Sequence, residues 1–146
     1  MRKIMVRSAV NAPFTTVVSH FNRSLLEALS PDLLRLRILQ YDGQLPGDRF
    51  CMQLGPSFLG VKWEGVVTAS GSTPGAYWFE DVGVRLPFPL KSWKHRHIVK
   101  MSEHGTVIID IIYFSSGFAP LDWFLFPFLL SMFKARTQKY RAFFNS

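Results

Sequence analysis

The feature that most constrains the fold is a series of segments with period-two alternation between residues 33 and 116, followed by a long helix. The segments alternate apolar and polar side chains, as the strands of a half-buried antiparallel sheet do. Clusters of Gly, Pro, Asp and Ser separate them as turns. The pattern predicts six strands, at residues 33–41, 49–55, 61–70, 76–84, 92–102 and 106–116.

The segments on either side of this series predict one more strand and three helices. Residues 4–10 alternate loosely and are rich in β-forming side chains, which predicts a strand. Residues 14–30 have apolar side chains at helical spacing, and we expect them to break near residues 22–24 into two short helices. A long C-terminal helix is expected from about residue 120 to about residue 143. Pro127 is expected to kink this helix or to mark its true start.

Together these elements predict an α+β fold in a single domain. A chain of 146 residues fits one domain and can bury a core without disulfides. No internal repeat or linker divides residues 1–146. A curved antiparallel sheet of about six to seven strands, wrapped on the long C-terminal helix, satisfies the pattern, with two short helices after strand one. If the sheet curls strongly, one helix cannot fill its concave side, and a cavity remains.

The stretch SWKHRHIVK, residues 92–100, places ring-bearing side chains at every second position. Residues i, i+2 and i+4 of a strand share one face, so Trp93, His95 and His97 should lie together. The cations between them suit a solvated outer face. We therefore expect the three rings to line the concave side of the sheet.

Three roles are open for His95 and His97. The nearest acids are expected to be Asp81 and Asp110 on the two neighbouring strands, and a hydrogen-bonded structural or ligand-orienting role is favoured. A general acid/base role would need a perturbed pKa and a bound carbonyl within reach. A metal site would need one of the two acids as third ligand. Because the other two His residues fall in a predicted helix and a predicted turn, we predict no metal.

Aromatic side chains are the other candidates for a cavity wall. They make up 15% of the chain and include 14 Phe, which suits a wide apolar interior. Any one of them is more simply a core residue, but their number favours a lined pocket. The predicted ligand-binding residues are Trp63, Phe79, Asp81, Trp93, His95, His97, Asp110 and Phe114.

Several other kinds of site are not supported. GxSxG, GxGxxG and GxxxxGK[ST] motifs are missing from the sequence, so hydrolase elbows and phosphate-binding loops are not expected. The single Cys51 lies between Phe50 and Met52 in a predicted strand, which favours a buried structural thiol. The net charge of +7 permits anionic partners, but the basic residues are spread through all strands without a nucleic-acid-binding motif. We expect no nucleic acid as partner.

Residues 121–133, LDWFLFPFLLSMF, form the most apolar stretch. It is shorter than the roughly 20 apolar residues that a membrane span needs, and it contains Asp122 and Pro127. A helix that is apolar on all sides is buried or touches something apolar. We expect a lid packed over the cavity; the alternative is a transient contact of the segment from Trp123 to Phe133 with a membrane surface. The protein is accordingly expected to be cytoplasmic, or peripheral to a membrane.

The ordered set of motifs resembles the START-related helix-grip superfamily, often called SRPBCC. The likeness spans nearly the whole chain, and within the superfamily it is greatest to small bacterial members related to polyketide cyclases/dehydrases and coenzyme-Q-binding proteins. The segments that carry it are VNAPFTTVVSHFN after strand one, VKW at 61–63, WFEDVGVRLPFPLKSWKHRH at 78–97, GTVIIDIIYFSSG at 105–117 and FKARTQKYRAFF in the last helix.

The resemblance implies an elongated, largely apolar cavity between the sheet and the C-terminal helix. The expected function is to bind a hydrophobic small molecule, such as a lipid, an isoprenoid or a polyketide-like compound, without a cofactor. One alternative is a cyclase/dehydrase-type enzyme that uses His95 or His97 with Asp81 or Asp110 as acid and base. Another is an interaction domain with a filled core, because a fold by itself does not determine a function.

Overall fold

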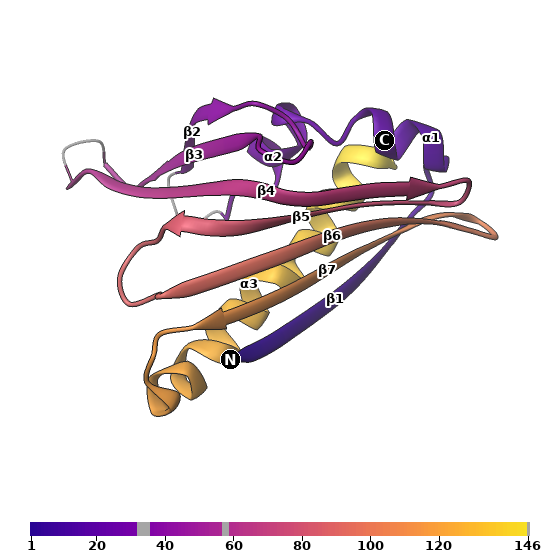
Figure 1. Ribbon diagram of the computed structural model, residues 1–146. Coiled ribbons are helices and arrows are strands. Elements are labelled where there is room, and N and C mark those ends of the chain that lie inside the picture. The colour runs from indigo at the N-terminus through magenta and orange to yellow at the C-terminus, as the bar shows by residue number, and fades with distance from the viewer. Residues whose placement is uncertain (32–35, 57–58, 146) are drawn as a thin grey trace.

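Within residues 1–31, 36–56 and 59–145, which the computed structural model describes, a seven-stranded antiparallel sheet and three helices form the molecule (Figure 1). The α+β architecture expected from the sequence is confirmed, including two short helices after strand one. The elements in chain order are β1 Arg2–Val10, α1 Phe14–Ser19, α2 Arg23–Ala28, β2 Leu36–Tyr41, β3 Arg49–Leu54, β4 Val61–Thr73, β5 Ala76–Arg85, β6 Ser92–Ser102, β7 Gly105–Ser115 and α3 Ala119–Phe144.

The sheet has the strand order β1-β7-β6-β5-β4-β3-β2. Strands that follow one another in sequence pair as neighbours from β2 to β7, whereas β1 pairs with β7, the last strand of the chain. Figure 1 shows α3 running obliquely behind the curved sheet, and its closest packing is on β1 and β7. The concave face of the sheet is therefore covered by one long helix along part of its width, with α1 and α2 closing the adjoining side.

Local signals account for the two short helices. Pro13 stands immediately before α1, where its fixed φ of −64° suits the approach to the first turn. Asn22 is the N-cap of α2, and its side chain accepts a hydrogen bond from the backbone N–H of Leu25. The predicted break near residues 22–24 is confirmed at this cap.

The structure corrects two of the sequence-based expectations, and a third lies partly outside the described residues. Of the strand predicted at 33–41, the structure describes Leu36–Tyr41 as β2. Residues 33–35 lie outside the described part of the chain. β4 continues past the expected end at residue 70, because its pairing with β5 extends to Thr73 opposite Ala76. α3 is continuous across Pro127, so the interpretation of this proline as the true helix start is wrong. The ring removes one backbone hydrogen bond, and packing on both sides of it holds the helix together.

Two clusters of buried side chains fill the space between the layers. The first joins α1, α2 and the C-terminal part of α3 to the sheet, and it includes Val17, Leu25 and Phe79. The second joins the middle of α3 to β1, β6 and β7, and it includes Trp93 and Phe114. The side chains of the candidate site lie where these two clusters meet, as the ring contacts described below show.

Candidate functional site

β6 presents alternate side chains to opposite faces of the sheet. Trp93 and His95 are buried on the concave face, and the side chain of His97 is nearly buried beside them. Lys94 and Arg96 project from the convex face, where both approach a carboxylate of β5. The strand therefore separates a ring-bearing concave face from a cationic convex face, as its two-residue period predicts.

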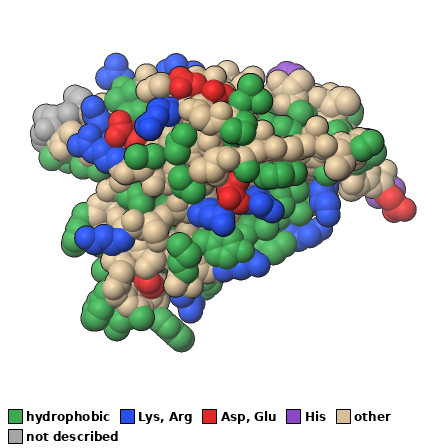
Figure 2. All heavy atoms as spheres, in the orientation of Figure 1, with side chains coloured by type: hydrophobic (Ala, Val, Ile, Leu, Met, Phe, Trp, Pro, Cys, Tyr) green, Lys and Arg blue, Asp and Glu red, His purple; other side chains and the backbone are tan. Residues whose placement is uncertain are grey.

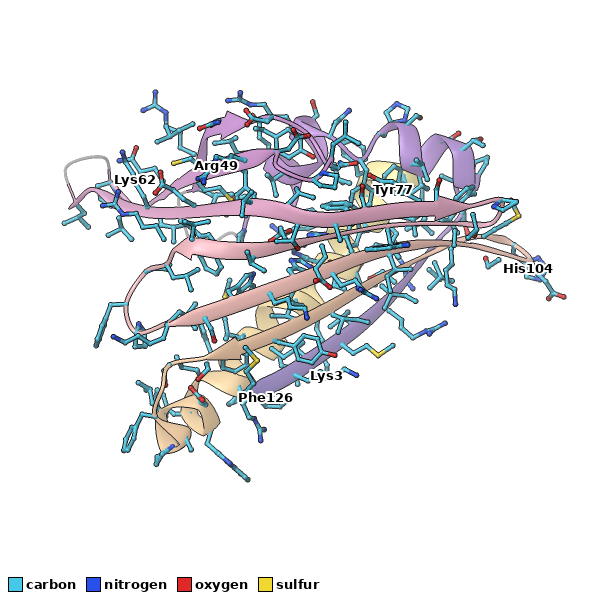
Figure 3. All side chains as sticks on the ribbon, viewed as in Figure 1. Lys3, Arg49, Lys62, Tyr77, His104 and Phe126 are labelled. Atoms are coloured by element: carbon cyan, nitrogen blue, oxygen red, sulfur yellow. The ribbon has the colours of Figure 1, made fainter. Side chains whose placement is uncertain are left out.

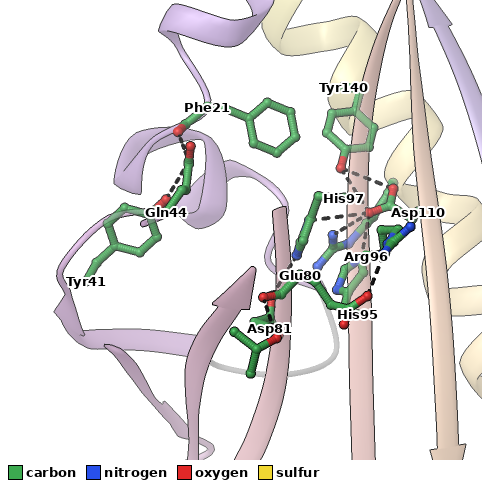
Figure 4. Close-up of polar contacts among 12 residues, drawn as sticks. Phe21, Tyr41, Gln44, Glu80, Asp81, His95, Arg96, His97, Asp110 and Tyr140 are labelled. Carbon is green, nitrogen blue, oxygen red and sulfur yellow. Dashed lines mark hydrogen bonds and ion pairs between the residues drawn. The ribbon is translucent and has the colours of Figure 1, made fainter. Parts of the chain in front are cut away.

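Two Asp–His pairs lie side by side on the concave face (Figure 4). In the sheet register, His95 stands opposite Asp81 of β5, and His97 stands opposite Asp110 of β7. The hydrogen bonds instead run diagonally. His95 Nε2 is 2.8 Å from Asp110 Oδ1, and His97 Nε2 is 2.8 Å from Asp81 Oδ2. Each imidazole thus bonds the diagonal acid and not the one directly opposite it.

The two imidazole rings stack on one another. Their centroids are 3.6 Å apart, with 26° between the ring planes. Phe79 stacks on His97 with a centroid distance of 4.1 Å, and Phe133 of α3 meets His95 edge-on at 5.4 Å. Two positive charges at this separation in a buried site would repel strongly, so the stack favours at most one protonated imidazole.

Burial keeps His95 neutral. Desolvation, assisted by the neighbouring His97, lowers the pKa of His95 to about 4 against the opposing effect of Asp110. For Asp110, burial alone would raise the pKa, but the hydrogen bond from His95 and the charge of Arg136 outweigh it and lower the pKa to about 2. At neutral pH, a neutral imidazole therefore donates its Nε2–H to an ionised carboxylate, which leaves the Nδ1 lone pair of His95 as an acceptor.

α3 supplies two polar groups that complete the surroundings of Asp110. The Tyr140 hydroxyl donates to Asp110 Oδ2 at 3.2 Å, and burial raises its pKa, which keeps it a donor. Arg136 Nη1 lies 3.5 Å from Asp110 Oδ1. The sequence interpretation missed both residues. The available signal was their spacing: Leu129, Phe133, Arg136 and Tyr140 share one helix face, which places a single cation in an otherwise apolar stripe.

A largely apolar pocket with a volume of about 150 Å³ lies beside the two imidazoles and is partly open to solvent. Its charged and imidazole groups are Asp81, His95, His97 and Arg136, all on β5, β6 and α3. The apolar part of the wall comes from α2, from the β2–β4 side of the sheet and from the middle of α3. Among these apolar residues are Leu25, Leu29, Phe50, Met52, Leu129 and Met132.

The structure places most of the predicted ligand-binding residues in the wall of this pocket. They are Trp63, Phe79, Asp81, Trp93, His95 and His97. Asp110 and Phe114 are fully buried and do not line the pocket. Asp110 is enclosed by its hydrogen-bond partners, and Phe114 packs in the cluster with Ile4 and Ile112. Strand alternation placed both on the correct face but could not separate the pocket wall from the core behind it.

Three side chains at this site carry atoms that could bind a metal ion. Asp81, His95 and His97 each offer a ligand atom, and these atoms lie within 4.8 Å of one another. Zinc needs lone pairs that converge on one point at about 2 Å from each nitrogen or oxygen. The stacked rings direct their lone pairs along nearly parallel planes, and Arg136 adds positive charge to the same wall. The arrangement suits hydrogen bonding to a polar ligand better than it suits a cation.

Cys51 has the environment of a structural thiol. It is buried in β3 and forms no disulfide. Burial raises the pKa of the thiol, whereas a nucleophilic cysteine needs an exposed, electropositive setting that lowers it. Among the candidate reactive groups, the imidazoles and carboxylates beside the pocket are therefore better placed than this thiol to interact with a ligand.

The apolar stretch at residues 121–133 forms only part of a lid. Leu129, Met132 and Phe133 line the pocket, whereas Trp123 and Phe124 are exposed to solvent. Among the helices of the described residues, none is both long enough and apolar enough to cross a membrane. The first half of the stretch is thus left with an apolar surface that the fold does not cover.

Comparison with known proteins gives similarity in structure but not in sequence. Neither a family model nor a curated protein matches the chain. Protein Ms6760 from Mycobacterium smegmatis is similar with a TM-score of 0.64 at 18% identity, over 97% of this chain and 89% of that one. A hypothetical protein from Helicobacter pylori has a TM-score of 0.69 at 13% identity, over 98% and 88%. Norcoclaurine synthase from Thalictrum flavum has a TM-score of 0.63 at 12% identity, over 95% and 85%.

Similarity at these identities concerns the path of the backbone and does not transfer an activity. The matches cover the sheet, the short helices and α3 together, since each includes more than nine tenths of the chain. They do not single out a subfamily, so the closer resemblance to polyketide cyclases/dehydrases and coenzyme-Q-binding proteins stays a prediction. The chain therefore shares the helix-grip fold of these structures, and its place in the SRPBCC superfamily stays a prediction.

Proposed function

We propose that the protein binds a hydrophobic small molecule that carries a polar group, in the pocket between the sheet and α3. The observation that supports this most is the division of the pocket wall. One part is apolar, and the imidazole and charged groups are gathered on β5, β6 and α3. Such a pocket holds an apolar body by the hydrophobic effect and orients it through a few polar contacts. Lipids, isoprenoids and polyketide-like compounds are the expected classes.

His95 is the group that we propose to orient the ligand. Its Nε2–H is engaged by Asp110, and within the described residues its Nδ1 has no hydrogen-bond partner. A ligand hydroxyl or enol would donate to this nitrogen. Arg136, which also lines the pocket, would donate to a carbonyl or carboxylate of the same ligand.

An acid/base enzyme is the second candidate. A His–Asp pair beside an apolar pocket is suited to proton transfer, and one of the structurally similar proteins is a synthase. The strength of a general base follows its pKa, however, and a pKa of about 4 makes His95 a weak base at neutral pH. His95 therefore fits a hydrogen-bonding role better than proton abstraction, and binding is the favoured function.

Native mass spectrometry of freshly purified protein, followed by solvent extraction, tests the proposed binding. A stoichiometric extra mass that extracts as one lipid or isoprenoid is the expected result. Uptake of a fluorescent fatty-acid or quinone probe gives a second readout for protein that lost its cargo during purification. A bare chain that takes up neither probe would overturn the proposal and favour a filled-core interaction domain or an enzyme with a transient substrate.

Two matched methionine variants show whether the probe occupies this pocket. Met132 lines the pocket, so Met132→Trp fills it and should weaken probe binding by about tenfold or more. Met101 is exposed at the far end of β6, and Met101→Trp should leave probe binding unchanged. Equal effects of the two substitutions would show that the probe binds elsewhere.

Replacing both imidazoles separates binding from catalysis. In the variant His95→Gln/His97→Gln, an intact fold that still takes up the probe, but more weakly because the contact with His95 is lost, supports a binding module. Loss of turnover of a candidate substrate with ligand binding retained would instead support the acid/base enzyme. Circular dichroism of the variant checks the fold, because both side chains are part of a buried network.

A further inference from the structure

The solvent-exposed face of α3 changes character halfway along the helix. In the first half, Trp123 is 69% exposed, Phe124 is 78% exposed and Phe128 is 53% exposed. In the second half, the exposed positions include Lys134 and Arg141. Apart from one buried Asp in the first turn, α3 contains no acidic residue. The helix thus presents an aromatic half and a basic half to solvent, while its opposite side lines the pocket and the core.

Two loops bring more exposed aromatic side chains to the same end of the molecule. Phe118 lies just before α3, and Phe88, in the loop between β5 and β6, is 92% exposed. The backbone N–H of Lys91 donates to the carbonyl of Ser115 at 2.8 Å, which holds this loop against the end of β7. We call the following set the aromatic end: Phe88, Phe118, Trp123, Phe124 and Phe128. Figure 2 shows hydrophobic side chains gathered at the lower left, where Figure 1 places the start of α3.

The aromatic end is held in place by buried hydrogen bonds and not by packing of its own rings. The backbone N–H and the hydroxyl of Ser116 both donate to Asp122 Oδ1 at 2.6 Å. These bonds tie the connection after β7 to the first turn of α3. None of the five rings belongs to the two core clusters of the described residues. Soluble monomers rarely expose a large apolar patch without a use for it, so these rings point to a partner.

Basic side chains surround the aromatic end. The guanidinium of Arg2 lies 5.0 Å from the ring centroid of Trp123 and 4.3 Å from that of Phe126. Lys91 is exposed in the adjoining loop, and Lys134 is exposed on α3 beyond the aromatic half. None of the segments that form this end contains an exposed acidic residue. Aromatic rings flanked by cations are the pattern of a surface that enters the interface of an anionic membrane.

We propose that the aromatic end docks on an anionic membrane surface, with Trp123, Phe124 and Phe128 entering the headgroup region. A second copy of the chain is the main competing partner. In a two-fold dimer, however, this patch would meet itself and bring like charges together without an acid to pair them. The residues of the aromatic end do not line the pocket, so membrane docking and ligand binding can be tested independently of one another. If both proposals hold, α3 lies between the membrane and the pocket.

Vesicle flotation of the full chain tests the docking. Vesicles of phosphatidylcholine alone are compared with vesicles that also contain phosphatidylglycerol. We expect binding to the anionic vesicles that weakens as salt is added, because salt screens the cations. The variant Trp123→Ser/Phe124→Ser/Phe128→Ser should bind about tenfold or more weakly, since it loses the rings that enter the interface.

Matched controls separate this surface from general stickiness. Met101→Ser removes an exposed apolar side chain next to the turn between β6 and β7. Figure 3 shows His104 of this turn at the opposite end of the molecule from Phe126 of α3, so this variant should bind vesicles like the unaltered chain. Lys134→Gln should weaken binding more than Lys100→Gln, which removes an exposed cation on β6. All variants concern exposed side chains, and circular dichroism verifies their fold.

Tryptophan quenching by brominated lipids reports insertion directly. Trp93 is buried, Trp63 packs against it, and Trp78 is half-buried beneath Arg96 on the convex face of the sheet, so quenching should come mainly from Trp123 and should be largely lost in Trp123→Phe. Absence of vesicle binding, or binding that the triple variant retains, would overturn the proposal. A concentration-dependent dimer that the triple variant abolishes would also overturn it and identify a self-association surface. The triple variant should still take up the fluorescent probe, so failure of docking and failure of ligand binding are distinguishable.

Discussion

Basic side chains meet carboxylates on both faces of the central sheet, but in opposite environments. On the concave side, His95 and His97 bond carboxylates whose side chains are almost fully buried. On the convex side, Lys94 and Arg96 approach Glu80 at 3.8 and 3.1 Å, and both cations are nearly half exposed. A shift of one residue along β6 separates the two sets.

The difference shows that burial, and not the type of pair, decides what these contacts do. Exposed pairs contribute about 0–1 kcal/mol, because water solvates both partners equally well when they separate. Breaking a buried pair leaves a group without solvent or partner, which costs about 1–3 kcal/mol for a neutral polar group and about 3–5 kcal/mol for a charge. The concave pairs therefore shape the site and its protonation state, while the convex pairs contribute mainly to the surface charge.

Asp110→Ala should give the largest effect. The carboxylate accepts hydrogen bonds from His95 and Tyr140 and faces Arg136, so its removal leaves three buried or part-buried groups without their acceptor. The free energy of unfolding, measured with urea at neutral pH, should fall by about 3–5 kcal/mol. A loss below about 1 kcal/mol, which is the range of exposed pairs, would contradict the expectation that pairs on the concave face contribute more than pairs on the convex face.

Lowering the pH should reduce the free energy of unfolding, because the concave-side groups have shifted pKa values. The pKa of His95 in the folded protein is about 4, below its ordinary value of 6.5, so the unfolded chain binds the proton first. Stability from this group is present above pH 6.5 and is lost as the pH falls towards 4, by up to about 1.4 kcal/mol per pH unit. The pKa of Asp110 is lowered from 3.8 to about 2, so this carboxylate adds a further loss of stability as the pH falls from about 4 to about 2.

A pair of His variants isolates the contribution of His95. Urea unfolding across this pH range should show a shallower slope for His95→Gln than for the unaltered chain. The exposed His104, in the turn between β6 and β7, serves as the control, and His104→Gln should leave the slope unchanged. An unchanged slope in His95→Gln would show that burial does not hold this imidazole neutral.

Asp81→Ala should have an intermediate effect. Asp81 accepts one hydrogen bond, from His97 Nε2, and His97 Nδ1 has no hydrogen-bond partner among the described residues. The substitution leaves this imidazole with neither nitrogen bonded to protein, at a cost of about 1–3 kcal/mol in urea unfolding. A loss as large as that of Asp110→Ala would contradict the ranking, in which the number of buried partners sets the cost.

Glu80→Gln should have the smallest effect. The carboxylate faces Lys94 and Arg96, which stay solvated when it is neutralised. We expect a loss of about 0.2–1 kcal/mol in urea unfolding, and a smaller one at high salt. A salt-independent loss comparable to that of Asp81→Ala would show that the convex pairs are as desolvated as the concave ones.

Strand periodicity was the most informative property of the sequence. In a strand the direction of each side chain follows from its position, so His95 and His97 could be placed on one face with Asp81 and Asp110 on the neighbouring strands. The diagonal bonding could not be predicted, because it depends on how the twisted sheet offsets the side chains and on the rotamer that each imidazole adopts.

The contributions of α3 were harder to anticipate. Arg136 and Tyr140 reach Asp110 only because the helix crosses the sheet at one particular place and angle. The sequence identified residues 121–133 as apolar on all sides, but it could not tell which side chains the core would cover. In the structure, Leu129 is buried, whereas Phe124 and Phe128 remain in solvent.

The amino-acid sequence by itself determined the order of strands and helices, the face that Trp93, His95 and His97 share, and the two acids that lie within reach of the imidazoles. These properties follow from local backbone geometry, which repeats every few residues. Only the tertiary structure decided which acid each imidazole bonds, which residues line the pocket and which aromatic rings stay exposed. These depend on distances between segments far apart in the chain, and small changes in the curvature of the sheet or the placement of α3 alter all of them.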